Sequence, residues 1–282
     1  MLKMNEIDLS GKRVLIRVDL NVPMSNGIIE NDSRIKATIP TIKLALQSNC
    51  SIILMSHMGR PREGIFEEDF SLNLVAENLS SALRREVRFI SNWDNNFDIN
   101  NGDIVLMENV RFLKGEKNND PDLSKKMGEL CDIFVMDAFA SAHRSHASTC
   151  GVIEFAKIAC IGPLFSYELE SLQRIFSNPK RPLLAIVGGS KISTKLEVIT
   201  SLAKSVDYLI LGGGIANTVL KAMGYEIGSS LYEESMLVTA KLLSEDTANN
   251  CVIPEILDVL VARKFSVESK AILKNIEDVS KD

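Results

Sequence analysis

The stretch from residue 183 to residue 195 reads Leu-Leu-Ala-Ile-Val-Gly-Gly-Ser-Lys-Ile-Ser-Thr-Lys. Its five leading apolar residues, two of them β-branched, are typical of a buried parallel strand. Gly188 and Gly189 then allow a tight turn and a close approach of the backbone to a ligand. From Ile192 onward apolar residues recur at helical spacing. The stretch therefore predicts a strand, a glycine-rich turn and a helix in direct succession.

A glycine-rich turn that opens onto a helix favours anions, because free N–H groups and the helix dipole point at the ligand. Lys191 and Lys195 lie where positive charge is unfavourable for the helix itself, which indicates an anionic partner. An ordinary β–α turn with solvated lysines is the alternative. The spacing does not fit a Walker A loop. Asn217 also stands where a dinucleotide fingerprint built on Gly212 to Gly214 would need Gly or Ala.

The composition is that of a globular protein, with 45% hydrophobic and 24% charged residues in 282 positions, enough for two domains. A net charge of −5 argues against a nucleic-acid binder, so any basic site must be local. Five scattered cysteines without zinc spacing indicate reduced thiols. The longest uncharged run is too short to span a bilayer. We therefore expect a cytoplasmic protein that binds neither nucleic acid nor membranes.

Short apolar runs alternate with helical patterns along the whole chain, which predicts a parallel α/β fold. We expect helices at 37–47, with Pro40 in the first turn, at 72–83, with Ser71 as N-cap, at 123–130 and at 166–176. Prolines and charges at 178–182 predict a domain boundary. Strands are expected at 14–20, 51–55, 87–90, 104–107, 133–136, 158–161, 183–187 and 208–211.

Basic and polar residues follow the strands of the first half, at the edge where parallel sheets bind ligands. Four arginines and a histidine at one edge predict an anion site in an otherwise acidic protein. Taken singly, His57 could be a core histidine and Asp19 a turn cap. His143 and His146 lack the third ligand that a zinc site needs. The residues of this edge are Asp19, Asn21, Arg34, His57, Arg60, Arg111 and Arg144.

Six motifs together closely resemble the phosphoglycerate kinase family, in order and over essentially the whole chain. They are Arg17-Val18-Asp19-Leu20-Asn21-Val22-Pro23, Ser56-His57-Met58-Gly59-Arg60-Pro61, Glu108-Asn109-Val110-Arg111-Phe112, Asp137-Ala138-Phe139 with His143-Arg144, Val187-Gly188-Gly189-Ser190-Lys191, and Gly212-Gly213-Gly214.

The resemblance implies two Rossmann-like domains joined by a hinge helix: a 3-phosphoglycerate-binding domain at 1–165, a helix and linker at 166–180, and a nucleotide-binding domain at 181–282. It implies a monomer that transfers phosphoryl between ATP or ADP and its substrate, with Mg²⁺ bound to the nucleotide. Arg34 and Lys191 would neutralise the transferred group. The implied substrate ligands are Asp19, Asn21, Arg34, His57, Met58, Gly59, Arg60, Arg111 and Arg144, and the implied nucleotide ligands are Gly189, Lys195, Gly212, Gly213 and Gly214.

One departure from the family pattern lies at the end of the chain. The family continues past the position of Asp282 for about another quarter of its length. That portion carries the family's metal ligand, so we expect the nucleotide domain to be partial here and to contribute no metal ligand. Two other functions stay open: a non-catalytic phosphoglycerate-binding protein, and a different α/β enzyme acting on phosphorylated substrates, such as a dehydrogenase. Asn217 disfavours the second.

Overall fold

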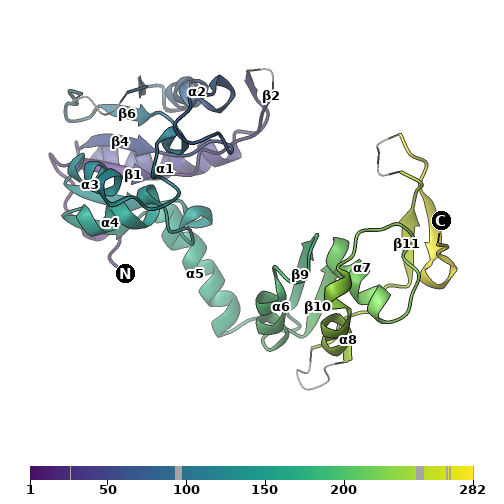
Figure 1. Cartoon of the computed structure of the whole chain (residues 1–282). Coiled ribbons are helices and arrows are strands. Elements are labelled where there is room, and N and C mark those ends of the chain that lie inside the picture. Colours follow the sequence, from purple (N-terminus) through teal and green to yellow (C-terminus); the bar gives the residue numbers. More distant parts are fainter. Residues whose placement is uncertain (26, 93–96, 246–250, 265, 267, 282) are drawn as a thin grey trace. The chain divides into compact units, whose positions relative to one another are not determined.

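The computed structural model of the chain describes residues 1–25, 27–92, 97–245, 251–264, 266 and 268–281. The chain divides into two compact units, Met1–Gln173 and Arg174–Asp282. The division falls inside helix α5 (Pro163–Ser177), which runs from the first unit into the second (Figure 1). Each unit has its own sheet and its own apolar core.

The first unit is built on a six-stranded parallel sheet with the strand order β5-β6-β4-β1-β7-β8. Four of its strands have the bounds predicted from the sequence. Three of these four are fully buried, and fully buried parallel strands read as continuous apolar runs. A two-stranded hairpin, β2 (Met24–Ser25) and β3 (Ile28–Ile29), accompanies the sheet. The sheet strands are β1 (Arg13–Arg17), β4 (Ser51–Met55), β5 (Arg88–Ile90), β6 (Ile104–Met107), β7 (Ile133–Met136) and β8 (Ile158–Ile161).

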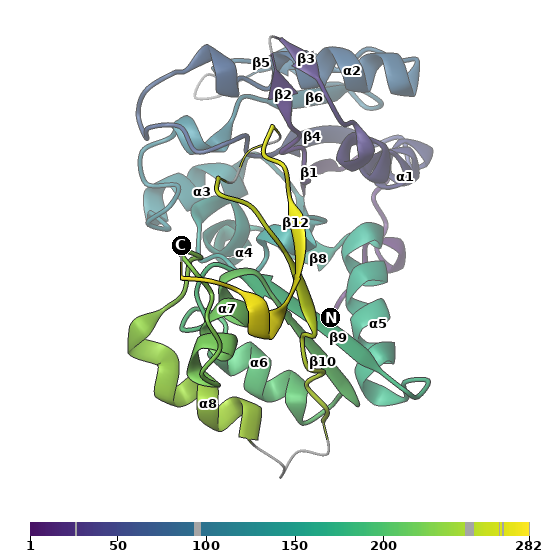
Figure 2. The ribbon, with the colours of Figure 1, turned by 90° about the vertical axis from the view of Figure 1, so that its right-hand side faces the viewer.

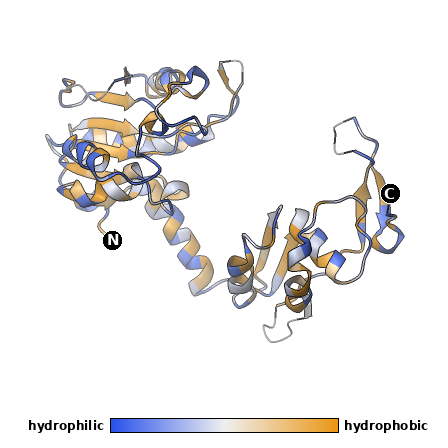
Figure 3. Ribbon diagram, viewed as in Figure 1, coloured by the Kyte–Doolittle hydropathy of each residue, from blue (hydrophilic) through white to orange (hydrophobic). Residues whose placement is uncertain are grey.

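Helices cover both faces of this sheet. On one face, Val14 and Ile16 of β1 pack in a core with helices α1 (Ser33–Gln47) and α2 (Asn73–Leu83). On the other face, Leu15 packs in a core with α3 (Pro121–Glu129), α4 (Val152–Phe155) and the first turn of α5. Figure 3 shows these sheet strands as largely hydrophobic. The connections that leave the neighbouring strands β1 and β7 thus run to opposite faces of the sheet, and ligands of parallel α/β sheets bind at the carboxyl edge beside such a point.

Short 3₁₀ segments and one π-helical segment occupy several loops around the sheets. The 3₁₀ segments are η1 (Met4–Glu6), η2 (Glu68–Phe70), η3 (Val110–Phe112), η4 (Phe139–Ser141), η6 (Glu234–Met236) and η8 (Ile276–Asp278), and the π-helical segment is η5 (Ala147–Gly151).

Three local predictions in the first unit are wrong. The first strand spans Arg13–Arg17 and ends three residues before the predicted end at residue 20. Helix α1 begins at Ser33 rather than Ala37, so Pro40 lies in its interior and not in the first turn. Because proline has no N–H, the helix lacks one backbone hydrogen bond at this position. The packing of the buried face of α1 compensates for this loss. The N-cap of α2 is Leu72 rather than Ser71. Ser71 still accepts from Asn73 N, the first N–H of the helix, at 3.3 Å, and the carboxylate of Glu108, just after β6, accepts from Leu72 N at 2.9 Å.

The second unit contains a two-stranded parallel sheet, β9 (Leu184–Gly189) and β10 (Tyr208–Gly212), with helices α6 (Leu196–Ala203), α7 (Gly213–Ala222) and α8 (Leu237–Glu245). An antiparallel hairpin, β11 (Asp258–Val261) and β12 (Ile272–Asn275), follows (Figure 2). The α/β fold class is therefore confirmed. The helix predicted from Ile192 starts only at Leu196, because Ile192 is buried in a turn and its carbonyl accepts from Lys195 N at 3.0 Å.

Candidate functional site

The carboxyl edge of the first sheet begins with the loop after β1. Arg34 Nη1 donates to both carboxylate oxygens of Asp19 and to the carbonyl of Asn21, each at 3.0 Å. The side-chain oxygen of Asn21 accepts from Gly59 N at 2.9 Å, which links this loop to the one after β4. Asp19 and Asn21 therefore orient Arg34 and connect two neighbouring strand ends. Arg34 itself is half exposed and accessible to a ligand.

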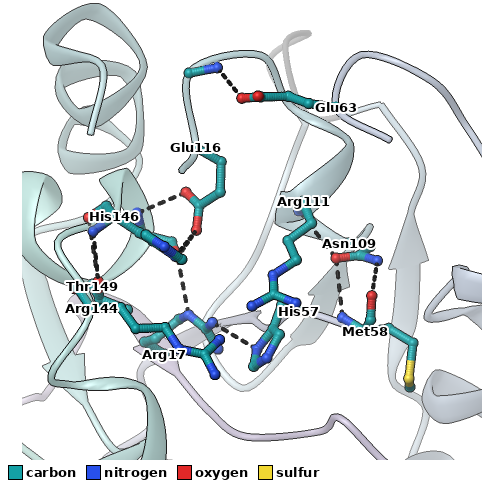
Figure 4. Close-up of polar contacts among 12 residues, drawn as sticks. Arg17, His57, Met58, Glu63, Asn109, Arg111, Glu116, Arg144, His146 and Thr149 are labelled. Carbon is teal, nitrogen blue, oxygen red and sulfur yellow. Dashed lines mark hydrogen bonds and ion pairs between the residues drawn. The ribbon is translucent and has the colours of Figure 1, made fainter. Parts of the chain in front are cut away.

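The loop after β4 is fixed by a glycine and an asparagine. Gly59 has φ +57°, and a Cβ atom there would lie 2.2 Å from the ring of Phe70. Asn109, at the end of β6, accepts from Met58 N at 3.1 Å and donates to Met58 O at 2.8 Å. Arg111 Nη1 donates to the carbonyl of Gly59. These contacts hold the loop in one conformation beside the arginine (Figure 4).

The last residue of β1, Arg17, is buried in the floor of this edge with 2% of its surface exposed. Its Nε donates to Ser148 Oγ at 3.2 Å, its Nη1 to the carbonyl of Val18 at 2.6 Å, and its Nη2 contacts His57 Nδ1 at 3.0 Å. Burial lowers the pKa of Arg17 to about 10, so the guanidinium stays charged at neutral pH. A permanent positive charge therefore lies directly behind His57 (Figure 4).

His57 is a neutral residue in a cationic environment. Burial and then the charges of Arg17, Arg111, Arg144 and Arg34 lower its pKa to about 2. Burial, and next the charge of Arg144, also lowers the pKa of Arg111. The Nε atom of Arg111 is buried without a hydrogen-bond acceptor among the described residues, so its guanidinium keeps unused donor capacity. Such a set of mutually repelling cations is arranged to receive an anion.

The predicted residues of this edge lie on elements far apart in the sequence. Arg34, Arg111 and Arg144 are close enough to His57 to lower its pKa, and the charge of Arg60 acts on Arg111. His143 and His146 share no helix face, because both lie in the turn between η4 and η5. His143 is exposed, whereas His146 places Nδ1 3.7 Å from Glu116. The ligand roles of these residues stay predictions.

The glycine-rich turns of the second unit pack backbone against backbone. Gly213 has φ +63° and pairs with Gly189 across the ends of β9 and β10. A Cβ atom on Gly214 would lie 2.3 Å from the carbonyl of Ser190, so the turns approach this closely only with glycine. Lys195 is the N-cap residue of α6, and Lys191 lies in the exposed loop before it. The arrangement leaves two lysines and exposed glycine backbone at one strand edge.

Three residues that contribute to these sites were missed at the sequence level. Arg17 carries a readable signal, since it directly follows the apolar run at residues 14–16 and is itself followed by apolar Val18. Glu116 is 1% exposed and accepts from Ser148 N at 3.0 Å and from Ser148 Oγ at 2.6 Å, yet it sits in a charged run typical of a surface loop. Glu233 accepts from Ser193 Oγ at 2.6 Å, which lowers its pKa. Glu233 and Ser193 are forty positions apart, so the sequence does not indicate that they form a hydrogen bond.

Comparison with known proteins identifies the family. The family model described as phosphoglycerate kinase matches residues 4–282. The chain belongs to the phosphoglycerate kinase family. The solved structure of phosphoglycerate kinase from Coxiella burnetii is 51% identical, with a TM-score of 0.84 over 99% of this chain and 72% of that chain. Phosphoglycerate kinase from Pyrococcus horikoshii OT3 is 25% identical, with a TM-score of 0.82 over 100% of this chain and 72% of that chain.

Two further features were sought among the described residues of this phosphoglycerate kinase family member: a membrane-spanning helix and a metal site. None of the described helices is long and apolar enough to cross a membrane. Among the same residues, no three His, Cys, Asp or Glu side chains gather in a geometry that could hold a metal ion.

Proposed function

We propose that this chain is a phosphoglycerate kinase that transfers a phosphoryl group reversibly between ATP and the carboxylate of 3-phosphoglycerate. The observation that carries the proposal is the cationic edge of the first sheet, where neutral His57 is surrounded by the charges of Arg17, Arg111, Arg144 and Arg34. A substrate with a phosphate and a carboxylate matches such an edge, because the forked donors of arginine fit both groups. Membership of the family gives the reaction.

The proposed chemistry explains why the edge is rich in arginine and has no general base. The acceptor carboxylate is ionised at neutral pH, so no proton has to be removed before attack. Catalysis then depends on holding the reactants in place and neutralising their charge. We assign 3-phosphoglycerate binding to Asp19, Asn21, Arg34, His57, Met58, Gly59, Arg60, Arg111 and Arg144.

We assign the nucleotide to the glycine-rich strand ends of the second unit. Gly189 and Gly212 to Gly214 allow the phosphates to approach the backbone, and Lys195 at the N-cap of α6 supplies positive charge. Lys191 and Arg34 are proposed to neutralise the transferred phosphoryl group. We propose that Mg²⁺ binds together with the nucleotide phosphates, where it would neutralise part of their charge.

The wider setting follows from the family and stays part of the proposal. Its partners are 3-phosphoglycerate, bound by a domain that we propose at 1–165, and ATP or ADP, bound by a domain that we propose at 181–282, with the helix and linker at 166–180 between the two domains in the chain. The enzyme acts as a monomer in the cytoplasm.

Titration calorimetry with 3-phosphoglycerate tests the substrate site. Arg60→Ala and Arg144→Ala should each weaken binding by about 1.5–3 kcal/mol, because each removes a charge-assisted hydrogen bond. Arg62→Ala is the matched control, because Arg62 lies in the same loop as Arg60 and its guanidinium pairs with Glu67 at 3.5 Å. The affinity of the Arg62→Ala variant for 3-phosphoglycerate should equal that of the wild type. Unchanged affinity in both test variants would contradict the assignment, and a coupled kinase assay checks turnover separately.

A further inference from the structure

A chain of buried hydrogen bonds runs beneath the carboxyl edge of the first sheet and ends at His57. Glu116 accepts from Ser148 Oγ at 2.6 Å, Ser148 Oγ lies 3.2 Å from Arg17 Nε, and Arg17 Nη2 lies 3.0 Å from His57 Nδ1. All four residues are at most 4% exposed. They come from different parts of the first unit, and the reaction itself gives Glu116, Ser148 and Arg17 no direct role (Figure 4).

Chemistry fixes the direction of each hydrogen bond in this chain. A guanidinium can only donate, so both Ser148 Oγ and His57 Nδ1 accept from Arg17. The hydroxyl of Ser148 therefore uses its own proton toward Glu116. A neutral imidazole that accepts at Nδ1 carries its proton on Nε2. The contact with Arg17 thus selects one tautomer of His57.

We propose that Arg17 is a positioning residue that holds His57 as the neutral Nε2–H tautomer, which makes Nε2 a fixed hydrogen-bond donor to the anionic substrate. The inference rests on the proposed function for the identity of that substrate. The tautomer itself is a property of the protein without ligand. Arg17 lies behind His57 in the floor of the sheet and acts on the substrate only through the imidazole.

Glu116 makes the arrangement stable. A buried guanidinium needs a counter-charge, and Glu116 supplies it through Ser148 without contacting His57. Burial raises the pKa of Glu116, while the Ser148 hydrogen bond and the charge of Arg17 act in the opposite direction. A variant that removes only Arg17 leaves Glu116 buried with a weaker counter-charge, that of Arg111. A double variant that neutralises both residues avoids this defect.

Nitrogen-15 NMR of the imidazole rings tests the tautomer directly. The chain has only three histidines, His57, His143 and His146, so His57→Gln suffices to assign the signal. In the wild type without ligand we expect the His57 proton on Nε2 and no titration between about pH 6 and pH 8. In Arg17→Met, and in Arg17→Met with Glu116→Gln, we expect a mixture of tautomers. A wild-type proton on Nδ1, or an unchanged tautomer in both variants, overturns the proposal.

Calorimetry with 3-phosphoglycerate tests the consequence for binding. Loss of one fixed neutral donor should raise the Kd of the double variant about 3- to 10-fold. Arg13→Met is the matched control, because it makes the same change at the exposed amino end of the same strand, and it should keep both the tautomer and the Kd. Released tautomers with an unchanged Kd overturn the positioning role. Failure of the wild type to bind 3-phosphoglycerate, with the expected tautomer present, refutes the proposed function instead.

Discussion

Replacing Asp137 by asparagine should remove a large pH dependence from the stability of the first unit. Asp137 follows β7, is 1% exposed, and accepts hydrogen bonds from the Thr41 hydroxyl of α1 and from Phe165 N of α5 at 3.0 Å. Asparagine keeps the shape of the side chain and an oxygen that accepts from Phe165 N. Its amide cannot ionise, so the variant isolates the titration of this one group.

The size of the effect follows from the pKa of the carboxyl. Burial raises the pKa of Asp137 from 3.8 to about 6, so the folded protein holds this proton more tightly than the unfolded chain. Its contribution to stability is complete below pH 3.8 and disappears as the pH rises through about 6. At 1.36 kcal/mol for each unit, a difference of about two units corresponds to about 3 kcal/mol.

Chemical unfolding of both proteins, followed by circular dichroism from about pH 3 to about pH 8, measures this contribution. The difference in unfolding free energy between wild type and Asp137→Asn should shift by about 3 kcal/mol over this range, with the wild type losing stability as pH rises. Asp132→Asn is the control of opposite sign. A hydrogen bond from Lys157 lowers the pKa of that exposed carboxyl, so its small contribution is lost as pH falls. A free-energy difference for Asp137→Asn that stays constant with pH would refute the reasoning.

Two further predictions concern the loops of the proposed sites. Gly59→Ala should destabilise the first unit by about 2 kcal/mol or more and weaken 3-phosphoglycerate binding, because the backbone has φ +57° and the added methyl group would clash with Phe70. Gly224→Ala is the control, since Gly224 has φ +95° but its Cβ would meet no atom within 4 Å. An equal loss of unfolding free energy in the two variants would show that the clash with Phe70 contributes nothing. Lys191→Ala should lower kcat with little change in the KM for ATP, whereas Lys195→Ala should mainly raise the KM for ATP. Steady-state kinetics on a catalytically competent chain distinguish these two effects. A change confined to KM in both variants would make Lys191 a ligand of the ground state and not of the transition state.

The sheet of the first unit was predictable because its central strands are buried on both faces. Residues 52–55 and 133–136 read as unbroken apolar runs, as expected for strands buried on both faces. Helix starts were less predictable, since tertiary packing decides them. The buried Ile35 draws α1 back to Ser33, and the buried Ile192 holds a turn where helical spacing predicts a helix.

The part of the candidate site that lies at the strand ends was predictable in the same way. Parallel strands bring their carboxyl ends to one edge, so Arg34, His57, Arg111 and Arg144 were expected to lie together. The buried support behind them was not, because its partners are joined only by folding. Nothing in the charged run around Glu116 indicates that this carboxylate turns inward to Ser148, and nothing in the β1 sequence says which imidazole nitrogen Arg17 contacts.

The low pKa of His57 has a consequence for metabolism in a cell whose internal pH drifts. An imidazole with a pKa of about 2 carries no charge anywhere in the physiological range, and its arginine neighbours keep theirs. The edge therefore presents constant charge to its substrate. Two groups named above still ionise between mildly acidic and mildly alkaline conditions: the substrate phosphate, whose second pKa is about 6, and the buried carboxyl of Asp137, whose pKa is raised to about 6. Any change of affinity with pH would then follow the metabolite and this one carboxyl, and not His57 and its arginine neighbours.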